Sequence, residues 1–481
     1  MSPRPSRTLA AGLAAVSALA MAATPAHAAP NRAGSPATSA DIAEQLRAIP
    51  GMTVISESAT PPAGYRFFVL GYTQPVDHTK PAGQTFQQRF QLLHKATDRP
   101  MVLHTTGYGM PAGAFRSEPT RLVDGNQISV EQRYFTPSRP SPADWDHLNI
   151  WQAATDHHRL VRALDPLYPA KWISTGASKG GMTSVYHRRY YPGDVDGVVA
   201  YVAPNDRVNP ADAAYDRFFA TVGGDTPAAR DCRARLDGVQ AQALRQRATL
   251  VARYAADAEA NGWTFAGTLG TVDRAFEMTV LDSVWAFWQY AGTSQCTGVP
   301  GPGATAEALY TWIDTYAGWS FYTDQGVTFY NPYYYQAATQ LGWASLKFTH
   351  LRGLTRYPGL YSANTALPPQ LRSHHNPLPM LDIDLWVRTR AAQMLFVYGE
   401  NDPWGAEAFT PSRHDSHTYT APGANHGANI AALTPADRDA ATAALQRWAG
   451  VSPAGQARAA QVELPVTALD RAEPRNQRHR P

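Results

Sequence analysis

Hydrophobic and polar residues follow two different periods along this chain. Short segments with the residue types and alternation typical of β-strands lie at 65–70, 85–93, 101–104, 127–130, 171–174, 198–202, 393–398 and 416–419. Two longer segments, 145–164 and 435–448, carry apolar residues at the spacing of an amphipathic helix. The chain is therefore predicted to combine strands and helices.

The order of these segments predicts an α/β fold. The first two strands are expected to form an antiparallel pair. From residue 101 onward strands alternate with helical segments, which is typical of a parallel sheet with helical crossovers. Between 206 and 382 this pattern gives way to Ala- and Arg-rich helical sequence (228–258) and an aromatic-rich run (310–348). We predict an inserted helical domain there, which we call the cap.

The amino terminus has the features of a secretory signal peptide. Arg4 and Arg7 precede an apolar stretch at 9–23, and Ala26 and Ala28 place small residues before a cleavage point after Ala28. The alternative is a membrane anchor, but the apolar stretch is shorter than the roughly 20 residues that a spanning helix needs. We expect a secreted protein that does not associate with membranes.

The composition is that of a globular protein, with 44% hydrophobic and 17% charged residues among 481. The formal net charge is +3, and no dense basic run occurs before the last dozen residues, so nucleic-acid binding is not suggested. The expected division of the chain is a signal peptide (1–28), a flexible leader or short pro-segment (29–45), the two parts of the core (46–205 and 383–451), the cap (206–382) and a polar, solvated tail (452–481).

The two cysteines, Cys232 and Cys296, both lie in the predicted cap. In an exported protein the simplest expectation is that they form a disulfide. Two buried thiols are the alternative.

The segment 176–180, Gly-Ala-Ser-Lys-Gly, is a G-x-S-x-G sequence. So short a motif also arises by chance, but a predicted strand precedes it and helical spacing follows it. Strand, sharp turn and helix form the elbow that exposes a nucleophilic serine above a sheet edge. The flanking glycines are needed because strand and helix approach too closely for a Cβ. Ser178 is therefore the candidate nucleophile.

A serine nucleophile needs a histidine base and a carboxylate that orients it. Asp402 and His426 each follow a predicted strand, and the chain order Ser178, Asp402, His426 is the one expected for an α/β-hydrolase. We predict this catalytic triad, with an α/β-hydrolase core beneath the helical cap. Three titratable residues nearby are expected to be surface residues: His414, Asp415 and His417.

Acyl transfer also needs hydrogen-bond donors for the oxyanion. One donor is expected from the Lys179 backbone amide and another from the glycine-rich loop at Gly107 and Tyr108. A dinucleotide-binding turn is the alternative for this loop, but Ala112 occupies the position of the third glycine. We expect no cofactor, and no metal, because adjacent histidine pairs do not share a face.

With these motifs in place, the sequence resembles the secreted bacterial prolyl tri- and tetrapeptidyl aminopeptidases. The resemblance runs from about 65 to 448 and is carried by the segments 87–90, 131–135 and 176–183 and by the Asp402 and His426 loops. It implies a serine exopeptidase with an α/β-hydrolase core that releases tri- or tetrapeptides from a free amino terminus, preferring proline at P1. Residues 131–135 also look like a signature of the lysosomal prolyl carboxypeptidases, but Gln132 replaces the usual histidine.

An aminopeptidase must offset the desolvation of the substrate ammonium with a carboxylate. Glu131 and Asp206, each at a predicted strand end, are the candidates, although a buried pair between Glu131 and an arginine is an alternative. Peptides are the expected partners of a monomeric enzyme. Two other hypotheses are a lipase or carboxylesterase of the same fold, and a non-catalytic binding protein. The choice between tripeptide and tetrapeptide release stays open.

Overall fold

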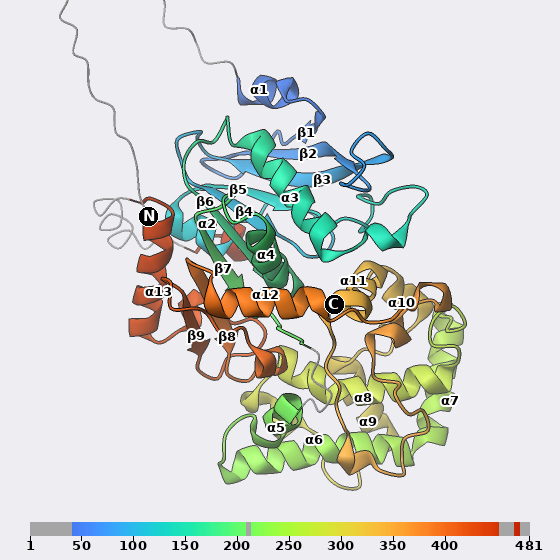
Figure 1. Cartoon of the computed structure of the whole chain (residues 1–481). Helices are drawn as coiled ribbons and strands as arrows, with labels where there is room; N and C mark the ends of the chain where they lie inside the picture. Colours follow the sequence, from blue (N-terminus) through green and yellow to red (C-terminus); the bar gives the residue numbers. More distant parts are fainter. Residues whose placement is uncertain (1–40, 208–212, 452–465, 472–481) are drawn as a thin grey trace, which may run out of the picture. The chain divides into compact units, whose positions relative to one another are not determined.

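In the computed structural model, which describes residues 41–207, 213–451 and 466–471, nine strands form a single sheet (Figure 1). Their spatial order is β1, β2, β3, β5, β4, β6, β7, β8, β9. The strands span Met52–Glu57 (β1), Arg66–Pro75 (β2), Thr85–His94 (β3), Met101–Thr105 (β4), Asn126–Val130 (β5), Trp172–Ala177 (β6), Gly197–Tyr201 (β7), Met394–Gly399 (β8) and His417–Ala421 (β9).

The sheet has an antiparallel part and a parallel part. β1, β2, β3 and β5 pair antiparallel, whereas β5, β4, β6, β7, β8 and β9 pair parallel to one another. Each run predicted as a strand forms one, and the first two are antiparallel as predicted. The predicted α/β fold class is therefore confirmed. Sequence patterning missed β1, whose residues are mostly exposed.

Helices cover both faces of the parallel strands because these strands are apolar on both sides. In β8, Leu395 and Val397 pack with α13, whereas Met394 and Phe396 pack in the opposite core with α3, α4 and α12. The helices around the sheet span Ile42–Ala48 (α1), Glu118–Val123 (α2), Ile150–Leu164 (α3), Lys179–Tyr190 (α4), Leu378–Thr389 (α12) and Pro435–Trp448 (α13).

The chain between β7 and α12 forms the cap, seen in green to orange in Figure 1. Its buried aromatic and aliphatic side chains form one core cluster, which also includes Tyr134, Phe135 and Leu148 from outside the cap. Cys232 and Cys296 are joined by a disulfide, as predicted. The cap helices are Ala213–Thr221 (α5), Pro227–Arg245 (α6), Arg247–Asn261 (α7), Val272–Tyr290 (α8), Ala306–Tyr316 (α9), Asp324–Thr328 (α10) and Asn331–Gln336 (α11).

Two boundaries between the parts of the chain differ from those that the sequence suggested. Helix α1 starts at Ile42 and buries Ile42 and Leu46, so the last part of the expected leader (29–45) belongs to the folded structure. Helix α12 starts at Leu378 and buries Met380 in the sheet core, inside the range expected for the cap. The signal peptide and its cleavage point lie outside the described residues.

Part of the C-terminal tail is docked, which corrects the expectation of a solvated end. A short helix, Ala468–Arg471 (α15), follows Thr467. Asp470 accepts hydrogen bonds from Arg116 Nε and Nη2 at 2.6 and 2.7 Å, and the Arg116 amide donates to the Leu469 carbonyl oxygen. The pattern of polar residues could not reveal this contact because it depends on a partner far away in sequence.

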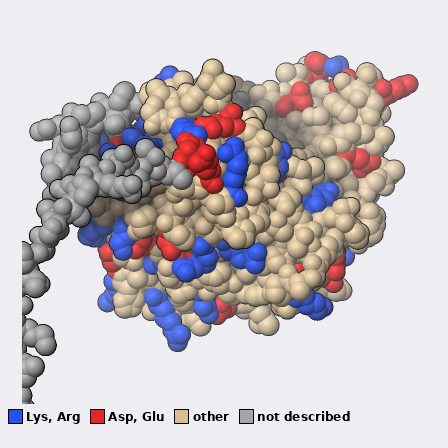
Figure 2. All heavy atoms as spheres, turned by 90° about the horizontal axis from the view of Figure 1, so that it is seen from above, with Lys and Arg blue, Asp and Glu red and all other residues tan. Residues whose placement is uncertain are grey.

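Basic and acidic side chains are interspersed on the face shown in Figure 2. This face therefore has no extended field of one sign that would attract a charged polymer. Among the described helices, none is both long and apolar enough to cross a membrane.

Replacing Asp470 with Asn should destabilise the protein by about 1–3 kcal/mol at neutral pH, because Arg116 would stay buried without its carboxylate. Burial works to raise the pKa of Asp470, but the hydrogen bonds from Arg116 outweigh it and hold the pKa below its ordinary value of 3.8. The stabilisation is therefore present above pH 3.8 and is lost as the pH falls through the lowered pKa. Urea unfolding at several pH values measures the difference. Asp439→Asn, whose carboxylate is 81% exposed, is the matched control and should have little effect.

Candidate active site

Ser178 lies at the sharp turn between β6 and α4. Its φ of 55° and ψ of −127° are an unusual conformation for a residue other than glycine. The Ser178 amide donates to the Tyr201 carbonyl oxygen of the neighbouring strand at 2.9 Å, which ties the turn to the sheet. This is the geometry expected of a nucleophile elbow.

The backbone around the elbow is packed too closely for side chains at two glycines. A Cβ at Gly180 would lie 2.4 Å from the Thr105 carbonyl oxygen. A Cβ at Gly107, which has a φ of +72°, would lie 2.4 Å from the Gly180 nitrogen. The loop after β4 therefore passes directly against the start of α4.

Asp402 and His426 meet at the same edge of the sheet. Asp402 Oδ2 lies 2.8 Å from His426 Nδ1, and Asp402 Oδ1 accepts a hydrogen bond from the Trp404 amide at 3.1 Å. The carboxylate is buried, and the imidazole side chain is 10% exposed. Within the described part of the chain, His426 Nε2 is buried and has no hydrogen-bond partner. That nitrogen is therefore available to accept a proton.

Ser178, Asp402 and His426 follow β6, β8 and β9 respectively. Since these strands run parallel on either side of β7, their carboxyl ends lie along one edge of the sheet. The nearby titratable residues expected at the surface do not join the triad. Asp415 accepts a hydrogen bond from the Trp448 indole and lies next to His417.

The loop at Gly107 and Tyr108, which we call the oxyanion loop, presents a different hydrogen-bond donor from the one expected. The Tyr108 amide, a predicted donor, already donates to Thr106 Oγ1 at 3.2 Å. The Tyr108 hydroxyl, however, lies near the Ser178 side chain, and burial raises the pKa of this phenol. The phenol therefore stays protonated near the nucleophile. The Lys179 amide is the first of helix α4, where no intrahelical acceptor exists.

The Lys179 side chain is buried beneath this loop. Its Nζ donates to the Gly107 carbonyl oxygen at 2.6 Å and lies 5.8 Å from the centre of the Tyr108 ring. Burial lowers the pKa of Lys179 to about 7. Burial is the only cause of this shift, and among the described residues no carboxylate offsets it. The amine thus fixes the loop that carries Tyr108.

The chain matches the protein family described as PS-10 peptidase S37 over residues 35–480. It belongs to the PS-10 peptidase S37 family. A prolyl tri/tetrapeptidyl aminopeptidase of Streptomyces mobaraensis is 49% identical to it over 439 residues, or 90% of each chain. The resemblance and the enzyme class inferred from the sequence, a peptidase, are confirmed.

Two solved structures are also similar. A proline iminopeptidase of Mycobacterium smegmatis has 13% identity and a TM-score of 0.36, with 79% of this chain and 98% of the other covered. Acetyl xylan esterase 1 of Thermoanaerobacterium sp. JW/SL YS485 has 10% identity and a TM-score of 0.36, with 84% of this chain and 90% of the other covered.

The two acidic residues considered for the substrate amine both have partners inside this S37 peptidase. Glu131 accepts hydrogen bonds from the Met110 amide at 3.0 Å and from the Ser138 amide and hydroxyl at 3.2 and 2.5 Å. Asp206 accepts one from the Tyr215 hydroxyl at 2.9 Å and is 3% exposed. The expected alternative, a pair between Glu131 and Arg133, is absent from the described residues, since Arg133 pairs with Asp156 instead.

Sequence reasoning missed two residues that position the catalytic loops. Gln289 lies on α8. Its backbone oxygen accepts a hydrogen bond from the His426 amide at 3.2 Å, and its side-chain oxygen accepts one from the Trp404 indole N–H at 3.1 Å. Glu118, on α2, accepts the Ile430 amide at 2.8 Å just beyond the histidine loop. Neither residue belongs to a recognisable motif, so no sequence signal could have identified them.

Replacing Lys179 with Met should change how the stability of this S37 peptidase depends on pH. Because burial lowers the pKa of the folded amine to about 7 while the unfolded value is 10.5, the unfolded chain binds more protons between these values. The stability of the wild type relative to Lys179→Met should therefore rise by about 1.4 kcal/mol per pH unit from pH 7 to 10.5 and be flat below pH 7. Urea unfolding at pH 6, 7, 8 and 9 tests this. A constant difference would contradict it, and Lys80→Met, at an exposed lysine, is the control.

Proposed function

We propose that this protein is a secreted serine exopeptidase that releases tri- or tetrapeptides from free amino termini, preferring proline at P1. The main support is the Asp402–His426 pair with its open Nε2, on the sheet edge that carries Ser178. The 49% identical relative is a prolyl tri/tetrapeptidyl aminopeptidase, which favours the same reaction for this chain. The disulfide is typical of an exported protein, which favours secretion. We further propose that the protein acts as a monomer.

In the first step Ser178 Oγ attacks the carbonyl carbon of the scissile bond, and His426 Nε2 takes the hydroxyl proton. Asp402 holds the Nδ1–H tautomer of His426, so that Nε2 presents a lone pair, and it stabilises the imidazolium that forms. The imidazolium then protonates the leaving amine, and an acyl-enzyme remains. Water, deprotonated by His426, attacks this ester and releases the peptide.

The tetrahedral oxyanion is stabilised by donors that are already in place. We assign one to the Lys179 amide and another to the loop at Gly107 and Tyr108. Since the Tyr108 amide is engaged with Thr106, Tyr108 acts through its hydroxyl, which lies against the Ser178 side chain. A buried phenol with a raised pKa is a donor that does not lose its proton at neutral pH.

Substrate selection needs a carboxylate for the amino terminus. Glu131 lies beside the oxyanion loop, because its Oε1 accepts the Met110 amide. Asp206 follows β7 on the same sheet edge. Glu131 and Asp206 are therefore both close enough to the site to be tested for binding of the substrate amine.

For Ala-Ala-Pro-p-nitroanilide, Ser178→Ala should lower kcat by about 10⁶-fold because the nucleophile is lost, and Asp402→Asn by about 10⁴-fold because the histidine tautomer is lost. Ser294→Ala, at an exposed cap serine, is the matched control. The wild type should cleave this substrate much faster than its N-acetylated form or p-nitrophenyl butyrate. Turnover of the butyrate with neither peptide would instead identify an esterase.

Tyr108→Phe should lower kcat by about 10²–10³-fold, the usual cost of removing one oxyanion donor. The phenyl ring preserves the packing against Phe135 and Tyr333, so the thermal stability should change little. Tyr419→Phe, on β9, is the matched control. An unchanged kcat would show that the hydroxyl does not contact the oxyanion.

A further inference from the structure

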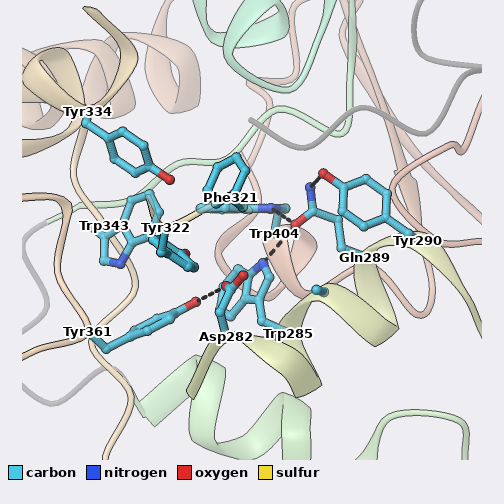
Figure 3. A pocket seen from close by; sticks show the side chains of 11 residues that line it. Asp282, Trp285, Gln289, Tyr290, Phe321, Tyr322, Tyr334, Trp343, Tyr361 and Trp404 are labelled. Atoms are coloured by element: carbon cyan, nitrogen blue, oxygen red, sulfur yellow. Dashed lines mark hydrogen bonds between the residues drawn. The ribbon is translucent and has the colours of Figure 1, made fainter. Parts of the chain in front are cut away.

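A pocket in the cap has walls made almost entirely of aromatic rings (Figure 3). Its polar lining residues other than tyrosine and tryptophan are Asp282 and Gln289, both on α8. Of the described residues that line it, Asp282 is the only one with a charged side chain. The aromatic lining consists of Trp285, Tyr290, Phe321, Tyr322, Tyr334, Trp343, Tyr361 and Trp404.

One side of this pocket adjoins the catalytic histidine. The Trp404 ring lies 6.4 Å from the His426 ring, centre to centre. Gln289 accepts hydrogen bonds from the indole N–H groups of Trp285 and Trp404, each at 3.1 Å (Figure 3). Its backbone oxygen also accepts a hydrogen bond from the His426 amide. The pocket wall and the histidine loop are therefore held together.

Another part of the lining adjoins Tyr108, the residue near the nucleophile. Tyr334 and Trp343 pack against Tyr333 with ring centres 5.1 and 6.1 Å apart. Tyr333 in turn packs against Tyr108 at 5.6 Å. Ring contacts therefore join the pocket lining to Tyr108 as well as to His426, so the pocket is close to the position of the scissile bond.

The chemistry of the pocket fits an organic ammonium group. Asp282 Oδ1 accepts a hydrogen bond from the Tyr361 hydroxyl at 3.3 Å, and burial together with the charge of Asp282 raises the pKa of that hydroxyl. A carboxylate among rings attracts a cation strongly, because the rings exclude water and their faces also attract positive charge. The same surroundings would repel an anionic group and suit the apolar side chain of a terminal residue.

We propose that Asp282 binds the amino-terminal ammonium of the substrate, with the aromatic rings surrounding that group. This inference rests on the proposed aminopeptidase function. It also explains why only short peptides leave: the fixed distance from Asp282 to Ser178 determines how many residues fit between the ammonium and the scissile bond. Glu131 and Asp206 then serve as structural acceptors for Met110, Ser138 and Tyr215.

The test is the ratio of kcat/KM for Ala-Ala-Pro-p-nitroanilide to that for its N-acetylated form. Asp282→Asn keeps an acceptor for Tyr361 but removes the charge. The ratio should fall by about 30-fold or more, through the free-amine substrate alone. Asp231→Asn, at a cap carboxylate that is 60% exposed, is the matched control. Labelling of Ser178 by a small fluorophosphonate should proceed at the wild-type rate in both variants.

The outcomes separate this inference from the proposed function. If the wild type itself shows no preference for the free amine, the aminopeptidase function fails. If the wild type shows the preference and Asp282→Asn retains it, the inference is overturned, and loss of the preference in Glu131→Gln or Asp206→Asn would locate the amine site there.

A second measurement needs no variant that could misfold. Trp285, Trp343 and Trp404 line the pocket, so its occupation should change the tryptophan fluorescence of the wild type. Alaninamide, which carries the ammonium, should produce a saturable change and inhibit cleavage competitively. N-acetylalaninamide should do neither, and an equal response to both compounds would count against an ammonium site.

Discussion

Ser178 can hold its unusual backbone conformation because the backbones around it touch without intervening side chains. The first turn of α4 lies against the ends of β4 and β6, and Gly180 and Gly107 leave room for that approach. The strain of a serine at positive φ, of the order of 1–3 kcal/mol, is offset by the packing of two buried elements. The nucleophile, the oxyanion loop and the Lys179 side chain beneath it all depend on this contact.

The cap is part of the catalytic geometry as well as a cover. The final turn of α8 places the Gln289 carbonyl where it accepts the His426 amide, and the neighbouring Ala291 carbonyl accepts the Asn425 side chain at 2.9 Å. The histidine loop is therefore anchored to the cap on one side and to Asp402 on the other. Any movement of α8 would shift the aromatic pocket and His426 together, which couples substrate binding to the alignment of the base.

Some buried charged side chains stabilise the fold, whereas another, Lys179, lies next to the catalytic serine. Arg133 and Asp156 form an ion pair without solvent exposure, and Arg133 also donates to the backbone oxygens of Val76 and His147. That network is fully satisfied and holds loops near the start of α3. Lys179 donates to one carbonyl oxygen, and burial lowers its pKa to about 7, so its protonation is sensitive to pH near neutrality.

The sequence by itself determined eight of the nine strands, the antiparallel lead-in, the inserted cap, the disulfide and the family, because periodicity and short motifs are local properties of a chain. It also indicated Ser178, Asp402 and His426, since each follows a strand in a recognisable order. Only the tertiary structure decided which atoms meet: the Tyr108 hydroxyl at Ser178, Gln289 at the histidine loop, and Asp282 among aromatic rings. It also revealed Asp470 docked on Arg116 in a tail that composition suggested was solvated. These contacts join residues far apart in the chain, so their energies depend on distances and burial that no local pattern encodes.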